Sequence, residues 1–140
     1  MKLAIGCDHG GIDLKKVLVP IIKELGWTID DHGCYSADSV DYPTFANLVC
    51  EDVLTGKSDR GLLICGTGIG MSMAANRHKG IRAALCNDIF TARMSREHND
   101  ANVLCLGARV IGAGVAAEMI KEWLQTEFAG SRHLRRIEMF

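Results

Sequence analysis

Short apolar runs alternate with longer segments of helical periodicity along this chain. Continuous apolar runs of this length are typical of buried strands in a parallel sheet. They predict strands at Lys2–Cys7, Trp27–Asp30, Gly61–Ile64, Ile81–Cys86 and Val103–Leu106. Between the first two runs, apolar side chains recur every three or four residues, at Leu14, Val17 or Leu18, Ile21 and Leu25, which predicts an amphipathic helix.

Glycine and proline mark the ends of the first two predicted helices. Gly26 is expected to end the first helix, and Pro20 to kink it. Asp41 is expected to cap the second helix, with Pro43 in its first turn, and Gly56 to end it. The remaining predicted helices are Met71–Asn76, Ile89–Glu97 and a long last helix marked by Val115, Met119, Ile120 and Trp123.

This alternation of strand and helix predicts an α/β fold, a three-layer α/β/α Rossmann-like sandwich with a five-stranded parallel sheet. No linker or repeat interrupts the pattern, so residues 1–140 are expected to form a single domain. Ligands of such sheets bind beyond the carboxyl ends of the strands, where the strand order reverses. Asp8-His9 and Cys65–Gly70 both follow strands. If they border one cleft, the first three strands lie in the order 2-1-3.

The glycine-rich turn after the third strand is the strongest candidate for a functional site. Three glycines, Gly66, Gly68 and Gly70, follow Cys65 and enclose Thr67. A turn of this kind presents backbone N–H groups at a helix N-terminus, where they bind anions. The same environment favours the thiolate form of a cysteine. The alternative is that Cys65 is a small buried hydrophobic residue, as cysteines at strand ends often are.

Known nucleotide-binding motifs do not account for this turn. No Gly-Lys-Ser/Thr follows it, so it is not a Walker A loop. The spacing of its glycines is GxGxG, and no GxGxxG dinucleotide motif is present.

Composition excludes several classes of protein. The net charge of −1, from 16 basic and 17 acidic residues, gives no support to nucleic-acid binding. The six cysteines include no Cys-x-x-Cys pair and no His/Cys cluster at zinc spacing, which argues against a metal site. Neither a signal peptide nor a membrane span is recognisable. We therefore expect a cytoplasmic protein with reduced cysteines that binds neither membrane nor metal.

Polar residues with catalytic or binding chemistry gather at the predicted strand ends and in the basic tail. They are Asp8, His9, Cys65, Thr67, His98, Asn99, Arg109, Arg132 and Arg136. Clustered arginines in a tail are most often simply exposed to solvent. An arginine can also bind a phosphate through two hydrogen bonds.

The chain resembles the type B ribose-5-phosphate isomerase family, which includes galactose-6-phosphate and allose-6-phosphate isomerases. The resemblance covers nearly the whole chain. Its motifs are Gly6–Gly11, Asp41–Pro43, Ile64–Ser72, Ala75–Arg77, Gly80–Ala83, Ser95–Leu104, Gly107–Arg109 and Arg132–Arg136. The stretch Met71–Ala75 lacks the glutamate base of some relatives, which leaves Cys65 as the candidate base.

The resemblance implies an aldose–ketose isomerase that interconverts ribose 5-phosphate and ribulose 5-phosphate through a cis-enediolate, without a metal or other cofactor. Cys65 would be the base, Thr67 would assist proton movement between oxygens, and His98 would open the sugar ring. The oxyanion would be held by backbone N–H groups of the glycine turn, at Gly66, Gly68, Ile69 and Gly70.

The resemblance also assigns substrate contacts. Asp8 and Asn99 would hold sugar hydroxyls. The residues near the phosphate would be His9, Arg109, Arg132 and Arg136. Some of these would come from a second copy, so a homodimer or a tetramer with shared active sites is expected.

Other functions remain open from the sequence. The substrate could be a six-carbon sugar phosphate, such as allose 6-phosphate or galactose 6-phosphate. A non-catalytic phosphate-binding module would explain the glycine turn but would leave Cys65, His98 and Asp8 without roles. A thiol redox or metal protein would explain the six cysteines, but the missing Cys-x-x-Cys pair argues against it.

Overall fold

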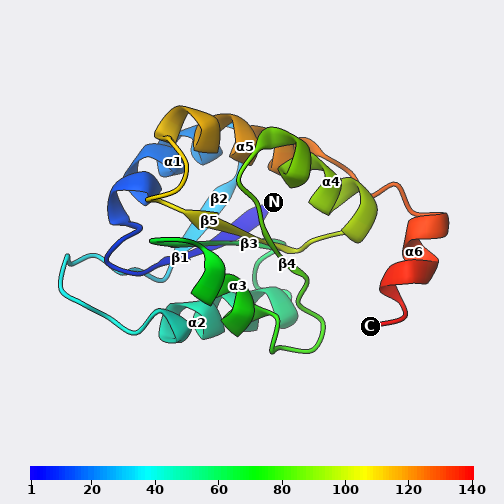
Figure 1. Cartoon of the computed structure of the whole chain (residues 1–140), viewed down its shortest axis with the longest axis horizontal. Helices are drawn as coiled ribbons and strands as arrows, with labels where there is room; N and C mark the ends of the chain where they lie inside the picture. Colours follow the sequence, from blue (N-terminus) through cyan, green and yellow to red (C-terminus); the bar gives the residue numbers. More distant parts are fainter.

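Five parallel strands form one sheet, and a helix follows each of them (Figure 1). The structure is a computed structural model that describes all 140 residues. The strands are β1 (Lys2–Cys7), β2 (Thr28–Asp31), β3 (Arg60–Cys65), β4 (Ala83–Leu85) and β5 (Val103–Gly107). The helices are α1 (Ile12–Glu24), α2 (Tyr42–Leu54), α3 (Ile69–Ala75), α4 (Ile89–Asn99), α5 (Ala113–Gln125) and α6 (Arg132–Ile137).

The strand order is β2-β1-β3-β5-β4, which confirms the predicted partial order 2-1-3. Cys7 at the end of β1 pairs with Ile64 of β3, and Cys65 pairs with Gly107 of β5. The carboxyl ends of these three central strands therefore lie side by side. The turns that follow them meet at one edge of the sheet.

Helices cover both faces of the sheet, which confirms the three-layer sandwich. Successive side chains of a strand point to opposite faces. Leu62 and Leu104 accordingly pack with Trp123 and the α1 and α5 side of the core, together with Ala92 of α4. Leu63 packs on the other face with α2 and α3. Figure 1 shows α1, α4 and α5 on one side of the sheet and α2 and α3 on the other.

Local sequence signals place the helices close to their predicted positions. α2 begins directly after Asp41, with Pro43 in its first turn, although the Asp41 side chain makes no capping hydrogen bond. α4 has a side-chain cap, because the Oδ1 of Asp88 accepts a hydrogen bond of 2.7 Å from the Thr91 N–H. α1 runs through Pro20 and ends before Gly26, whose φ of +83° lies in the left-handed region.

The bounds of both edge strands differ from the predicted ranges: β2 is shifted by one residue, and β4 is shorter at both ends. β2 begins at Thr28, because the Trp27 N–H still donates to the Ile22 carbonyl at the end of α1. β4 spans only Ala83–Leu85, since the Ile81 N–H donates to His78 in the preceding turn. An edge strand has one neighbour, so its ends are set by its turns as much as by its apolar run.

The basic tail is helical, which the apolar pattern did not predict. Residues Arg132–Ile137 form α6, and none of them is buried. A short helix with no buried face leaves no periodic apolar signal in the sequence. None of the helices is both long enough and apolar enough to cross a membrane.

Candidate active site

A polar cavity of about 250 Å³ lies at the carboxyl ends of β1 and β3. Its lining residues are Asp8, His9, Gly10, Tyr42, Cys65, Gly66, Thr67, Gly70 and Arg109. All except Gly10 and Tyr42 are among the residues that the sequence pattern and the family resemblance place in the site. Two turns that are more than fifty residues apart in the sequence thus form one cavity, as the strand order requires.

Cys65 is held at the base of the glycine turn. It is the last residue of β3, and only 5% of its surface is exposed. The Gly68 N–H donates a hydrogen bond of 3.0 Å to the Cys65 Sγ. Gly68 has a φ of +77°, and a Cβ there would lie 2.5 Å from the Leu85 side chain. Only glycine therefore fits this position, and the turn directs an N–H group to the sulfur.

The end of β5 supports the turn from the other side. The Ala108 N–H donates to the Cys65 carbonyl at 2.9 Å, and the Arg109 N–H donates to the Gly66 carbonyl at 3.0 Å. A Cβ on Gly107 would lie 2.6 Å from the backbone carbonyl of Thr67. The glycine at position 107 is therefore what allows the two backbones to approach so closely.

Asp8 and His9 are fixed by backbone groups. The Asp8 N–H donates to the Ile64 carbonyl at 3.1 Å, which joins the ends of β1 and β3. The Asp8 Oδ1 accepts a hydrogen bond of 2.8 Å from the Gly10 N–H, and the other carboxylate oxygen has no partner in the chain. The Nδ1 of His9 accepts a hydrogen bond of 3.4 Å from the Val40 N–H. The proton of the neutral imidazole therefore lies on Nε2.

Arg109 and Tyr42 complete the wall of the cavity. A Cβ on Gly66 would lie 3.5 Å from the Arg109 Cδ, so this arginine extends along the glycine turn. Arg109 is exposed and makes no ion pair within the chain. The Tyr42 ring lies against Gly70. The sequence signal for Tyr42 is its place between Asp41 and a proline, at the start of the helix that borders the cleft.

Burial keeps four of the other cysteines in the thiol form. All six are free and buried. Burial raises the pKa of Cys7 to about 11 and the pKa of Cys50 to about 11. Burial also raises the pKa of Cys86 and lifts that of Cys105 well above its usual value. These four are therefore protonated thiols at neutral pH.

The remaining predicted site residues lie at the opposite edge of the sheet. α4 begins beyond the carboxyl end of β4 and runs back, so His98 and Asn99 at its end precede β5. The strand β5 spans five residues, or roughly 13 Å from its first to its last Cα, between this group and the cavity. In Figure 1 the turn after β1 lies at one end of the sheet, and α6 lies beyond the other. The expectation that His98 and Asn99 belong to the same strand ends as Cys65 is wrong for a single chain.

This second group is itself well organised. The rings of His98 and His133 stack at 4.2 Å between centroids, with an angle of 7° between their planes. Partial burial and the neighbouring His98, Arg132 and Arg136 lower the pKa of His133. Arg132 and Arg136 are exposed, lie one turn apart on α6 and make no ion pair within the chain. They are free to bind an anion.

One cluster of possible metal ligands lies outside the cavity. Donor atoms of Asp30, His32 and Asp52 lie within 4.8 Å of one another. The Lys57 ammonium occupies this cluster, 2.8 Å from Asp30 and 3.2 Å from Asp52. Lys57 and Lys2 lower the pKa of Asp30 to about 2. The carboxylates are thus neutralised by lysine, and none of the three residues lines the cavity.

Residues 3–140 match the family model described as Ribose/Galactose Isomerase. The chain belongs to the ribose/galactose isomerase family. Ribose-5-phosphate isomerase B of Escherichia coli is 44% identical to it over 137 residues, which cover 98% of this chain and 92% of that protein. The Bacillus subtilis protein YwlF is 53% identical over 138 residues, which cover 98% and 93% of the two chains.

Solved structures agree with this family assignment. The ribose-5-phosphate isomerase B of Clostridium thermocellum superposes with a TM-score of 0.97 at 50% identity, covering 99% of this chain and 94% of that one. The type B enzyme of Trypanosoma brucei superposes with a TM-score of 0.96 at 48% identity, covering 99% and 95%. This member of the ribose/galactose isomerase family is therefore a sugar-phosphate isomerase, an enzyme of the aldose–ketose isomerase class.

Proposed function

We propose that this isomerase interconverts ribose 5-phosphate and ribulose 5-phosphate, with Cys65 as the base. The observation that carries this proposal is the Cys65 sulfur beside the Gly68 N–H, at the edge of a cavity that also holds Asp8, His9 and Arg109. A volume of about 250 Å³ suits a small polar molecule better than a dinucleotide. The E. coli relative is a ribose-5-phosphate isomerase, which supports the choice of the pentose.

The reaction requires one proton to move between neighbouring carbons. In the direction of the ketose, the Cys65 thiolate removes the proton from C2 of the open-chain aldose. The C2–H electron pair forms the C1–C2 double bond, and the carbonyl oxygen gains negative charge. The thiol then returns the proton to C1. A positioned base contributes roughly 10²–10⁴-fold to such a step.

The glycine turn supplies the charge stabilisation that enolisation needs. Backbone N–H groups from Gly66 to Gly70 would donate to the oxyanion of the enediolate, and one such donor contributes about 10²–10³-fold. The Thr67 hydroxyl, exposed on this turn, would move the proton between the two oxygens. Asp8 would hold a sugar hydroxyl through the carboxylate oxygen that the Gly10 N–H does not use.

We further propose that two copies of the chain share each active site. His98, Asn99, Arg132 and Arg136 lie too far from the Cys65 cavity to act on one substrate molecule within a single chain. A two-fold dimer has the same patch on both subunits, so each copy could present its His98 group to the cavity of the other. Ile69, Met73 and Phe90 leave large apolar side chains exposed on α3 and the first turn of α4, as a subunit interface would require.

In the shared site, the second copy's His98 would open the sugar ring and its Asn99 would hold a hydroxyl. Its Arg132 and Arg136 would bind the phosphate together with His9 and Arg109 of the first copy. Hydrogen bonds in which the donor or the acceptor is ionised are about twice as strong as those between neutral groups.

A coupled assay over a panel of sugar phosphates tests the proposal. Ribose 5-phosphate should be turned over with a higher kcat/KM than allose 6-phosphate or galactose 6-phosphate. A preference for a six-carbon sugar would change the substrate but keep the mechanism. Tight binding of ribose 5-phosphate without turnover of any sugar would instead indicate a phosphate-binding module.

A further inference from the structure

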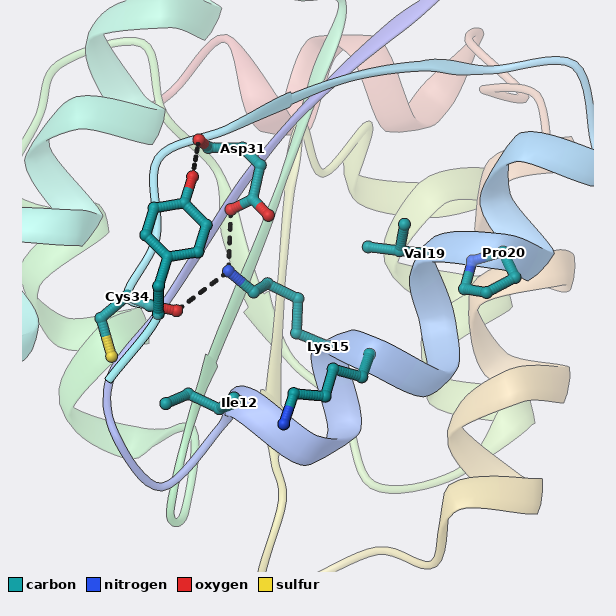
Figure 2. A pocket seen from close by; sticks show the side chains of 8 residues that line it. Ile12, Lys15, Val19, Pro20, Asp31 and Cys34 are labelled. Carbon is teal, nitrogen blue, oxygen red and sulfur yellow. Dashed lines mark hydrogen bonds and ion pairs between the residues drawn. The ribbon is translucent and has the colours of Figure 1, made fainter. Parts of the chain in front are cut away.

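A second cavity, of about 320 Å³, lies between α1 and the segment that follows β2 (Figure 2). It is lined by Ile12, Lys15, Lys16, Val19, Pro20, Asp31, Cys34 and Tyr35. None of these residues lines the Cys65 cavity. In Figure 2 the Lys15 side chain extends from α1 toward Asp31 and Cys34, away from the apolar wall formed by Val19 and Pro20.

Lys15 is a buried cation with every contact directed at one segment. Only 5% of its surface is exposed. Its Nζ lies 2.8 Å from the Asp31 Oδ1 and donates to the Cys34 carbonyl at 3.1 Å. The same Nζ lies 4.5 Å from the centre of the Tyr35 ring. A buried ammonium is stable only while such partners are in place, so these contacts fasten residues 31–35 to α1.

The stretch from Asp31 to Val40 contacts the end of β1 and the Asp8-His9 turn, at one point each. The Cys7 N–H donates to the Gly33 carbonyl at 2.7 Å, and the Cys34 N–H donates to the Cys7 carbonyl at 2.8 Å. Cys7 directly precedes the Asp8-His9 turn. Further along, the Val40 N–H donates to the Nδ1 of His9. Residues 35–39 between these points are exposed. Backbone hydrogen bonds join the first point to β1, and the Lys15 ammonium joins it to α1.

We propose that Lys15 is a positioning residue, which fixes the orientation and tautomer of His9 through the segment from Asp31 to Val40. With Nδ1 occupied by the Val40 N–H, the neutral ring presents an Nε2–H donor. Under the proposed function, on which this inference rests, that donor faces the phosphate end of the substrate. Release of the segment lets His9 exchange tautomers and weakens its hydrogen bond to the substrate.

The variant that tests this role is Lys15→Met, which keeps an unbranched side chain of nearly the same length and removes the charge. Lys16→Met is the matched control, because Lys16 lines the same cavity but is exposed and pairs only with Asp13 on the surface. Two readouts are taken: the tautomer of His9 by nitrogen NMR, assigned by comparison with His9→Gln, and the kinetics with ribose 5-phosphate.

Wild type and Lys16→Met should both show His9 as the Nε2–H tautomer and share one KM. Lys15→Met should show a mixture of tautomers, with KM raised roughly threefold to tenfold, the value of one hydrogen bond, and kcat changed less. A single unchanged tautomer, or an unchanged KM, in folded Lys15→Met overturns the proposal.

A second variant keeps the test decisive if Lys15→Met does not fold. Asp31→Asn removes the charge of the partner but retains an oxygen for the Gly33 N–H, which now bonds to Asp31 at 2.9 Å. Asp31→Asn should also produce a mixture of His9 tautomers, with a smaller share of the second tautomer than in Lys15→Met. An unchanged His9 tautomer overturns the proposal. If the wild type turns over no ribose 5-phosphate, the proposed function fails, whereas the NMR comparison still decides the role of Lys15.

Discussion

The amide nitrogen of Gly68 lies 3.0 Å from the sulfur of Cys65 and donates to it. This contact lies within the four-residue turn Cys65–Gly68, which the N–H groups of Ala108 and Arg109 support from the end of β5. An N–H directed at the sulfur stabilises negative charge there. Under the proposed function, other N–H groups of the same turn would donate to the enediolate oxygen, so the base and the oxyanion donors would belong to one short segment.

Alkylation should distinguish Cys65 from the other cysteines. Burial raises the pKa of four of these cysteines, to about 11 for Cys7 and Cys50, so their thiolate forms are scarce at neutral pH and grow only as the pH rises toward those values. Because Cys65 lines the cavity, iodoacetamide at neutral pH should modify it before these four and abolish activity, and bound ribose 5-phosphate should protect it. Peptide mass spectrometry checks the site. Inactivation that follows the modification of Cys7 or Cys50 would contradict this expectation.

Gly107→Ala should impair activity although it removes no reacting group. The added Cβ would lie 2.6 Å from the Thr67 backbone, which must move, and the glycine turn moves with it. We expect kcat to fall roughly tenfold to a hundredfold, since a misplaced oxyanion donor costs up to about 10²–10³-fold. Gly114→Ala is the control, because nothing lies within 4 Å of its Cβ. That change in α5 should leave kcat unaltered and raise the free energy of unfolding by about 0.5–1 kcal/mol. Equal kcat values for the two variants would refute this role of Gly107.

The sequence predicted the central part of the fold and one half of the candidate site. Buried strands and glycine turns carry strong local signals, so β1, β3 and the Cys65 turn lie where their residues indicate. The order 2-1-3 followed from placing two polar turns on one cleft, and the structure confirms it.

The other half of the candidate site could not be assigned from the pattern of apolar and polar residues in a single chain. His98 ends a helix that runs back across the sheet, and its distance from Cys65 depends on tertiary structure. Tyr42 lines the cavity through its ring, which packs on Gly70, and Gly10 through its backbone beside Gly66; no periodicity records either contact. α6 has no buried residue and so left no apolar signal.

Arg136→Ala should weaken substrate binding, whereas the neighbouring Arg135→Ala should not. A hydrogen bond to a charged group contributes about 1.5–3 kcal/mol, so KM for ribose 5-phosphate should rise roughly tenfold to a hundredfold in Arg136→Ala, with a smaller change in kcat. Arg132→Ala should behave in the same way. All three arginines are exposed on α6, which makes Arg135 a matched control for nonspecific charge effects. Identical KM values for all three variants would mean that α6 is only a solvated surface.

Mixed dimers should be more active than either parent. A Cys65→Ala chain lacks the base but keeps Arg136, and an Arg136→Ala chain has the reverse defect. If each site draws on both copies, a mixed dimer contains one intact site, and random exchange should restore roughly a quarter of wild-type activity. Exchange of the two impaired proteins, followed by the isomerase assay at substrate levels below the raised KM, measures this. No recovery in a verified mixed dimer, or a monomer by sedimentation at assay concentration, would rule out a shared site.

The most direct test of the account is the turnover of Cys65→Ala. The substitution removes the sulfur and leaves the glycine turn, the fold and the phosphate contacts in place. Binding of ribose 5-phosphate should persist while kcat falls by roughly 10²–10⁴-fold or more, and Cys65→Ser should not restore it, since a hydroxyl is a far weaker acid than a thiol. Unimpaired isomerisation by a verified Cys65→Ala protein would contradict the assignment of Cys65 as the base.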